Sequence, residues 1–285
     1  MELTYSKLRI IFLFSIILTS TNTFKNTNSA TENIKFNNEI HDTNGYQVIK
    51  ISQPRQTVYT QGLILSNDGR HLYESGGLYN KSTLKKFSYP SLNLENQQML
   101  SGKYFAEGIA KCGNVLYQLT WQENDILKYN FDDLTPIGKI RIDENMREGW
   151  GLTEYSNDHL LGTDGSEYIY FLNCNKNLKV EKRILVKEDE NLIRNLNALI
   201  YVNGYIYANR YYDTKIYKIN PDNGNVERTY EMSPLIKHEL KKGILTNTGL
   251  RIGNVLNGIA YDRTRDIFIL TGKLWGYFYE IKFEN

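Results

Sequence analysis

The sequence of 285 residues predicts an all-β protein folded as a five-bladed β-propeller, and three observations support this prediction. From about residue 50 onward, short apolar runs alternate with turn signals such as Ser-Asn-Asp-Gly at 66–69, a pattern typical of β-hairpins in series. One short phrase recurs five times in this region, which lacks long helical periods. The composition agrees, because 22 Tyr against 11 Phe and 3 Trp, together with 21 Gly, favour strands joined by turns.

The recurring phrase consists of a polar or aromatic residue, then Gly or Ala, then an aliphatic residue. It returns roughly every 45 residues with a longer last interval, and repeats of this length carrying three or four strands are typical of propeller blades. A small residue in the middle allows backbones to crowd near the propeller axis. The five copies are Gln61-Gly62-Leu63, Glu107-Gly108-Ile109, Trp150-Gly151-Leu152, Asn197-Ala198-Leu199 and Asn257-Gly258-Ile259.

Each phrase is expected to form the first strand of a blade, with a second strand after the next turn. The predicted second strands are 72–74, 116–118, 160–162, 206–208 and 267–269. Third strands are predicted at 84–87, 126–129, 168–171 and 215–219. The longer last interval contains an insertion, 233–254, in which 235–245 is expected to form a short helix.

The N-terminus is predicted to lie outside the propeller. Lys7 and Arg9 precede an apolar run at 10–18, which resembles a signal peptide and is short for a bilayer span. A short buried helix or an uncleaved interfacial anchor would give the same pattern. The predicted organisation is a signal peptide at 1–25, a polar linker at 26–48 and the propeller domain at 49–285.

A signal peptide implies the secretory pathway, meaning the extracellular space or the lumen of the ER or Golgi, with no stable membrane span. In that case Asn80, in Asn-Lys-Ser, is a glycosylation acceptor by its motif. Cys112 and Cys174 could form a disulfide, but the sequence leaves open whether they are close.

The composition also excludes several classes of protein and site. With 34 Lys+Arg against 32 Asp+Glu the net charge is +2, which argues against a nucleic-acid partner. The four histidines, at positions 41, 71, 159 and 238, have no metal-ligand spacing, so we predict no metal site and no catalytic zinc. No phosphate-binding loop or nucleophile elbow is present, so no cofactor is expected, although a structural cation on the axis stays open. We expect a monomer.

The residue before the small residue of each phrase is expected to face the central channel. This gives a ring of four polar groups and one indole, which could bind a ligand or could fill the channel with hydrogen-bonded side chains and water. Repeat geometry favours neither alternative. The ring is Gln61, Glu107, Trp150, Asn197 and Asn257.

Glu107 is the one member of this ring that can titrate. It lies beside aromatic residues, where burial would raise its pKa toward the range useful for acid–base catalysis. The alternative is a structural carboxylate bonded to loop amides. The three tryptophans, Trp121, Trp150 and Trp275, all fall at or after strand ends, which favours an aromatic-walled pocket over ordinary packing.

An ordered set of motifs runs from about residue 50 to the C-terminus. The segments are Tyr-Thr-Gln-Gly-Leu at 59–63, Leu-Tyr-Glu-Ser at 72–75, Phe-Ala-Glu-Gly at 105–108, Gln-Leu-Thr-Trp at 118–121, Glu-Gly-Trp-Gly-Leu-Thr at 148–153, Asp-Gly-Ser at 164–166, Tyr-Ala-Asn at 207–209, Val-Leu-Asn-Gly-Ile-Ala-Tyr-Asp at 255–262 and Thr-Gly-Lys at 271–273 with Trp275. This set resembles the plant- and bacterial-type glutaminyl-peptide cyclotransferases. The agreement in order makes the resemblance far more specific than any single motif.

The resemblance implies a five-bladed propeller that converts the N-terminal glutamine of peptides or proteins into pyroglutamate and releases ammonia, without zinc. It implies Glu107 as the catalytic acid/base and Lys273 as a site lysine that stabilises an oxyanion or bonds the peptide backbone. Gln61 and Asn197 would bond the substrate amide or the oxyanion. The implied aromatic walls are Tyr59, Phe105, Trp121, Trp150 and Tyr211, and Asn257 and Trp275 are additional candidates.

The sequence departs from the family pattern at four positions. Ala198 and Ile200 replace two carboxylates, which puts substrate positioning or rate in doubt. Tyr211 replaces a tryptophan, and Ala106 replaces the glycine before the catalytic glutamate. Two other functions stay open: a non-catalytic propeller that binds peptide N-termini or glycans, and a generic scaffold propeller.

Overall fold

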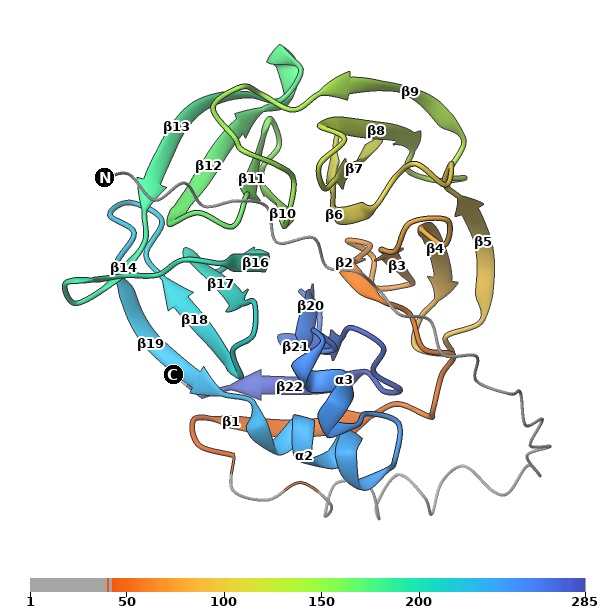
Figure 1. The fold of residues 1–285 in the computed structure, drawn as a ribbon, viewed down its shortest axis with the longest axis vertical. Helices are drawn as coiled ribbons and strands as arrows, with labels where there is room; N and C mark the ends of the chain where they lie inside the picture. The colour runs from red at the N-terminus through yellow and green to blue at the C-terminus, as the bar shows by residue number, and fades with distance from the viewer. Residues whose placement is uncertain (1–39, 41–42, 285) are drawn as a thin grey trace, which may run out of the picture.

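The computed structural model describes residue 40 and residues 43–284, and it confirms the five-bladed β-propeller. Five four-stranded antiparallel sheets are arranged around a central axis (Figure 1). The predicted signal peptide and most of the predicted linker lie outside the described residues. Within the described residues, no helix has the length and apolar character needed to cross a membrane.

The blades follow one another along the chain. Blade 1 contains β2 (Thr60–Leu65), β3 (His71–Gly76), β4 (Thr83–Ser88) and β5 (Leu94–Met99), and blade 2 contains β6 (Ala106–Cys112), β7 (Val115–Thr120), β8 (Asp125–Asn130) and β9 (Pro136–Arg141). Blade 3 contains β10 (Leu152–Ser156), β11 (His159–Thr163), β12 (Tyr168–Asn173) and β13 (Lys179–Leu185), and blade 4 contains β16 (Leu196–Val202), β17 (Tyr205–Arg210), β18 (Lys215–Ile219) and β19 (Val226–Glu231). Blade 5 contains β20 (Leu256–Asp262), β21 (Ile267–Gly272), β22 (Tyr279–Phe283) and β1 (Tyr46–Ile51).

The sequence predicted the inner part of every blade. The predicted first and second strands are confirmed in all five blades and the predicted third strands in four. The fourth strands of blades 1–4 lie at the rim of the disc (Figure 1); β5, β9 and β13 are mostly exposed, whereas β19 is mostly half-buried. An exposed outer strand buries no apolar face, so it lacks the alternating pattern by which strands are recognised.

Blade 5 joins the two ends of the described chain. Its outer strand β1 pairs antiparallel with β22, so that Tyr46 lies opposite Phe283 and Ile51 opposite Tyr279. The predicted domain boundary at residue 49 falls inside this strand, so residues 46–48 belong to the propeller and not to the linker. The partner strand is at the opposite end of the sequence, and no local signal could have indicated the pairing.

The insertion between β19 and β20 is helical, as expected, but it contains two helices. α2 (Ser233–Lys241) covers most of the predicted helix at 235–245, and α3 (Asn247–Arg251) follows it. Pro234 occupies the first turn of α2, where its missing N–H is not needed. Both helices lie beside blade 5 (Figure 1).

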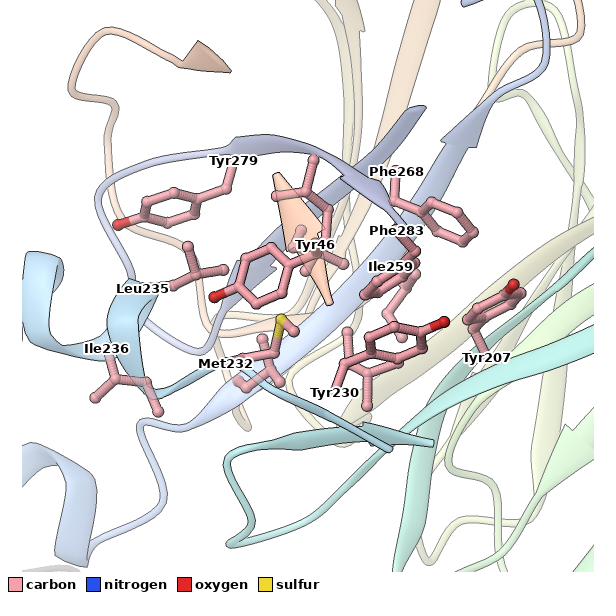
Figure 2. Close-up of a cluster of buried hydrophobic side chains, with 14 of the residues drawn as sticks. Tyr46, Tyr207, Tyr230, Met232, Leu235, Ile236, Ile259, Phe268, Tyr279 and Phe283 are labelled. Carbon is pink, nitrogen blue, oxygen red and sulfur yellow. The ribbon is translucent and has the colours of Figure 1, made fainter. Parts of the chain in front are cut away.

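Aromatic and aliphatic side chains fill the space between blades 4 and 5 and α2. Figure 2 shows this cluster, to which β1 of blade 5 contributes Tyr46 and α2 contributes Leu235. The rings of Tyr207 and Phe283 stack with their centroids 5.4 Å apart and an angle of 8° between their planes. Tyrosines of this kind pack one sheet against the next.

A disulfide resolves the question that the sequence left open for the two cysteines. Cys112, at the end of β6, is bonded to Cys174, with an S–S distance of 2.02 Å. Cys174 begins the short 3-10 helix η1 (Cys174–Lys176), which follows β12. The bond therefore links blades 2 and 3.

Candidate active site

Bulges in the inner strands bring the ring residues toward the axis. The register between first and second strands shifts between Thr60 and Gly62, between Ala106 and Ile109, between Leu196 and Leu199, and between Leu256 and Ile259. A bulge adds one residue to a strand and redirects its side chain. The recurring phrase thus corresponds to the bulge, and in four of the five blades the ring residue lies within it.

The middle position of the phrase is small because adjacent inner strands approach closely. A Cβ placed on Gly151 would lie 1.9 Å from the Asn197 carbonyl oxygen, and one on Gly108 would lie 2.5 Å from the Leu152 nitrogen. The Gly108 N–H also donates to the Trp150 carbonyl oxygen at 2.7 Å. The predicted crowding of backbones near the axis is confirmed.

Side chains at the ends of second strands hold the ring phrase of the following blade. Ser75 Oγ donates to the Glu107 carbonyl oxygen at 2.6 Å, and Thr163 Oγ1 donates to the Asn197 carbonyl oxygen at 2.9 Å. Asn209 Nδ2 makes the corresponding bond to the Leu256 carbonyl oxygen at 2.9 Å. These bonds fix the backbone of the ring residues, including that of Glu107. The donors occupy equivalent positions in the repeat, and this was the signal by which the sequence could have indicated their role.

Three ring residues form a buried chain of hydrogen bonds. Asn257 Nδ2 donates to Gln61 Oε1 at 2.8 Å, and Gln61 Nε2 donates to Glu107 Oε1 at 3.1 Å. All three side chains are buried. Gln61 and Asn257 therefore orient the carboxyl group of Glu107, while Glu107 Oε2 is buried and has no hydrogen-bond partner among the described residues.

Burial shifts the pKa values of the two charged groups of the site. It raises the pKa of Glu107 well above its usual value; Lys273 opposes this rise, whereas the like charges of Glu148 and Glu123 add to it. Burial lowers the pKa of Lys273 to about 8, against the opposing effect of Glu107. Burial thus favours the uncharged form of both side chains.

Lys273 is held between two aromatic rings. Its Nζ lies 4.4 Å from the centre of the Tyr211 ring and 5.2 Å from that of Tyr59. An antiparallel bridge between Tyr59 and Lys273 joins their backbones. The structure thus brings together three residues predicted for the site, from blades 1, 4 and 5.

Half-buried aromatic side chains surround these buried polar groups. Phe105 contacts Tyr59 and Trp121 edge to face, with centroids 6.2 and 5.6 Å apart. Trp150 contacts Tyr211 in the same way at 6.0 Å. Asn197 is buried nearby on the adjacent inner strand, and its Oδ1 has no hydrogen-bond partner among the described residues. The arrangement offers acid–base and hydrogen-bonding groups below an aromatic rim.

Comparison with known proteins identifies the family. The family model for glutamine cyclotransferase matches residues 17–283. The chain belongs to the glutamine cyclotransferase family. A glutaminyl-peptide cyclotransferase of Arabidopsis thaliana is 30% identical over 245 residues, which cover 86% of this chain and 73% of the plant protein. The crystal structure of Myxococcus xanthus glutaminyl cyclase is 29% identical and superposes with a TM-score of 0.72, covering 84% of this chain and 96% of the bacterial one.

Sequence reasoning missed one residue of this candidate site. Glu148 Oε1 accepts hydrogen bonds from both rim indoles, from Trp121 Nε1 at 2.8 Å and from Trp150 Nε1 at 2.7 Å. A partly buried indole N–H needs an acceptor, and this carboxylate stands two residues before Trp150. The proximity of a glutamate to Trp150 in the sequence was therefore the signal by which Glu148 could have been predicted.

Trp275 is a correction to the predicted cyclotransferase site. Its side chain is fully buried in the hydrophobic cluster of blade 5, where it meets Tyr279 edge to face at 6.0 Å. Leu274 has a left-handed backbone conformation with φ 60°, and the indole packs against Gly272. Trp275 therefore stabilises the blade and does not belong to the aromatic rim.

The departures from the family pattern fall at different places. Tyr211 lies in the rim and contacts Lys273. Ala106 and Ala198 are buried on inner strands. Ile200 lies farther along β16 and lines a small cavity with Lys111 and Glu154, on other inner strands. Among the described residues, no group of three or more His, Cys, Asp or Glu side chains could hold a metal ion.

Proposed function

We propose that the protein is a glutaminyl-peptide cyclotransferase, which converts the N-terminal glutamine of peptides or proteins into pyroglutamate. The observation that supports this proposal most is the buried Glu107 carboxyl group, with one oxygen oriented by Gln61 and the other without a partner in the described part of the chain. A buried acceptor without a partner is costly unless a ligand or water satisfies it. A substrate amine at Oε2 would meet that need.

In this mechanism Glu107 first accepts a proton and then donates the same proton. The neutral α-amine of the substrate attacks the carbon of the side-chain amide, and Oε2 takes a proton from that nitrogen as the new C–N bond forms. Glu107 then donates the proton to the departing –NH2 group as the old C–N bond breaks, so ammonia leaves and the carboxylate is restored. Because the attack is intramolecular, the enzyme gains mainly by holding the substrate folded.

Other site residues stabilise charge and position in the proposed reaction. The ammonium of Lys273 would balance the oxyanion of the tetrahedral intermediate, and the side-chain amide of Asn197 can donate a further hydrogen bond to it. The half-buried rings of Trp121, Trp150 and Tyr211 would enclose the glutamine side chain. A preorganised ammonium in a buried site stabilises developing charge better than one in water.

Ammonia release from a glutaminyl dipeptide tests the proposal directly. Glu107→Gln should lower kcat by about 10²- to 10⁴-fold, since the amide cannot carry the proton. Its thermal midpoint should equal or exceed that of wild type, because a buried amide costs less than a buried carboxylate. Glu144→Gln is the matched control, because Glu144 is exposed and lies four residues before Glu148; this variant should keep full activity.

An alternative is a propeller that binds peptide N-termini without turnover. It predicts calorimetric binding of the dipeptide with no ammonia above the uncatalysed rate. That result in folded wild-type protein would exclude the enzymatic proposal.

We also propose that the protein acts in the secretory pathway. Support comes from the disulfide between Cys112 and Cys174, a bond that persists in oxidising compartments. N-terminal sequencing of protein recovered from the medium of expressing cells tests this, and a retained Met1 would contradict it.

A further inference from the structure

Two connected cavities lie between blades 1 and 5, apart from the ring of catalytic candidates. The first has a volume of about 490 Å³, and its lining includes Arg55, Phe87 and Glu280. The second has a volume of about 530 Å³, and its lining includes Tyr59 and Leu274. Gln56 and Lys85 line both, so the two cavities form one cleft, which we call the blade 1–5 cleft.

The charges in this cleft do not balance. Arg55 is neutralised by a bidentate ion pair with Glu74, at 2.8 and 2.9 Å, and Glu280 is paired with Arg265 at 2.9 Å. Lys85 is 9% exposed, and no described residue forms a hydrogen bond or ion pair with its ammonium. Its cross-strand neighbour is Glu74, which gives both carboxylate oxygens to Arg55. An ammonium that lines the cleft on a largely buried side chain, with no charged partner among the described residues, can bind an anionic ligand that enters the cleft.

The cleft adjoins the proposed active site. Tyr59 lines it while its ring contacts Phe105 and Lys273 of the site. Gly77 also lines it, and a Cβ there would lie 2.5 Å from the Phe105 ring and 2.9 Å from the Gln61 side chain. A peptide chain leaving the site past these residues would enter the cleft.

We propose that the blade 1–5 cleft binds the part of the substrate that follows the N-terminal glutamine, and that Lys85 binds a carboxylate carried by this part of the peptide. This inference rests on the proposed function and narrows it to a preference for acidic peptides. Lys85 lies two residues along β4 from Thr83, which pairs with Gly76 beside the site. Two strand residues span about 7 Å, so the carboxylate belongs roughly three to five residues after the glutamine.

Peptides with a glutaminyl N-terminus and a single Glu or Gln at positions 3, 4, 5 or 6 test the proposal. For wild type we expect kcat/KM to be about fivefold to tenfold higher for the best acidic peptide than for its neutral counterpart. The difference should lie in KM and should shrink with added salt. Lys85→Gln should abolish it, and Lys85→Arg should retain it because the charge remains.

Lys86→Gln is the matched control. Lys86 neighbours Lys85 on β4, but its Nζ donates to the Asp132 carbonyl oxygen of blade 2 at 2.7 Å, away from the cleft. This variant should keep the acidic preference. Equal kcat/KM for acidic and neutral peptides in wild type, or a preference that survives in Lys85→Gln, would overturn the proposal.

A glutaminyl dipeptide separates this proposal from the proposed function. It is too short to reach Lys85, so its turnover should be unchanged in Lys85→Gln. Failure to turn over the dipeptide in wild type would count against the cyclotransferase reaction itself. Loss of the acidic preference with normal dipeptide turnover would count against the cleft alone.

Discussion

At the scale of single residues, a buried carboxyl group and a buried ammonium lie in one site, and burial shifts their pKa values in opposite directions. Burial raises the pKa of Glu107 and lowers that of Lys273 to about 8. In the proposed mechanism Glu107 must be ionised to take the proton, and Lys273 must be charged to stabilise the oxyanion. Activity therefore falls as pH decreases through the raised pKa of Glu107 and as pH increases through about 8.

This gives a bell-shaped dependence of kcat/KM on pH, with the alkaline limb near pH 8. The substrate α-amine titrates in the same range, so the rate of ammonia release should be expressed per neutral amine. Lys273→Arg should move the alkaline limb to higher pH because a guanidinium keeps its charge. An unchanged alkaline limb in this variant would assign it to another group.

Glu148 permits a second prediction at this scale. Glu148→Ala removes the acceptor shared by Trp121 and Trp150, so both indoles gain rotational freedom and KM should rise about tenfold. Glu148→Gln keeps an acceptor and should change KM less. It also removes a like charge, which should move the acid limb attributed to Glu107 to lower pH.

Tryptophan fluorescence offers an independent measurement for the Glu148 variants. Trp275 is buried in blade 5 and should contribute a constant signal, whereas the rim indoles should become more accessible to quenchers in Glu148→Ala. Glu144→Ala, an exposed change near the same loop, is the control. If KM and quenching are both unchanged in Glu148→Ala, Glu148 does not position the indoles of Trp121 and Trp150.

At the scale of elements, four of the five inner strands combine a bulge with the small residue of the recurring phrase. The turn signals and alternating apolar residues of the first three strands are local properties, which is why the sequence predicted them. The recurring phrase was visible in the sequence, but the bulges that it forms were not predicted. The outer strand β9 escaped prediction because Ile137 and its neighbours are exposed and give no pattern.

Gly151→Ala tests the close approach of inner strands. The added Cβ would lie 1.9 Å from the Asn197 carbonyl oxygen, and since backbone cannot move aside easily, we expect a loss of about 3 kcal/mol in the free energy of unfolding. Gly162→Ala is the control, because its added Cβ would meet the side-chain ends of Leu172 and Met146 at 3.1 and 3.3 Å, which can shift. Urea unfolding measures both, and equal midpoints for the two variants would contradict the interpretation.

At the scale of the whole molecule, the ring of blades is closed by non-local bonds. β1 completes blade 5 beside β22, and the disulfide between Cys112 and Cys174 joins blades 2 and 3 across a sequence separation of 62 residues. Replacing both cysteines by serine should lower the free energy of unfolding by roughly 4 kcal/mol, the value expected from loop entropy. Urea unfolding measures this difference.

Activity provides the control for the disulfide. Glu107 and Cys112 occupy opposite ends of β6, so the double variant should keep wild-type turnover under conditions where it is folded. A reducing agent should lower the stability of wild type but not that of the variant. If the reducing agent destabilises the wild type and the variant equally, the predicted decrease in the free energy of unfolding does not come from loss of this disulfide.

The five repeats, the first strands and the candidates Glu107, Trp121 and Trp150 could be predicted from the sequence, and the resemblance to the family added Lys273. These follow from turn chemistry, apolar alternation and motifs, which act over a few neighbouring residues. The partners of Glu148, the burial of Trp275, the closure by β1 and the absence of a partner for Lys85 among the described residues could be seen in the folded structure alone. Each depends on distances between segments far apart in the chain, which are fixed only when the blades pack around their axis.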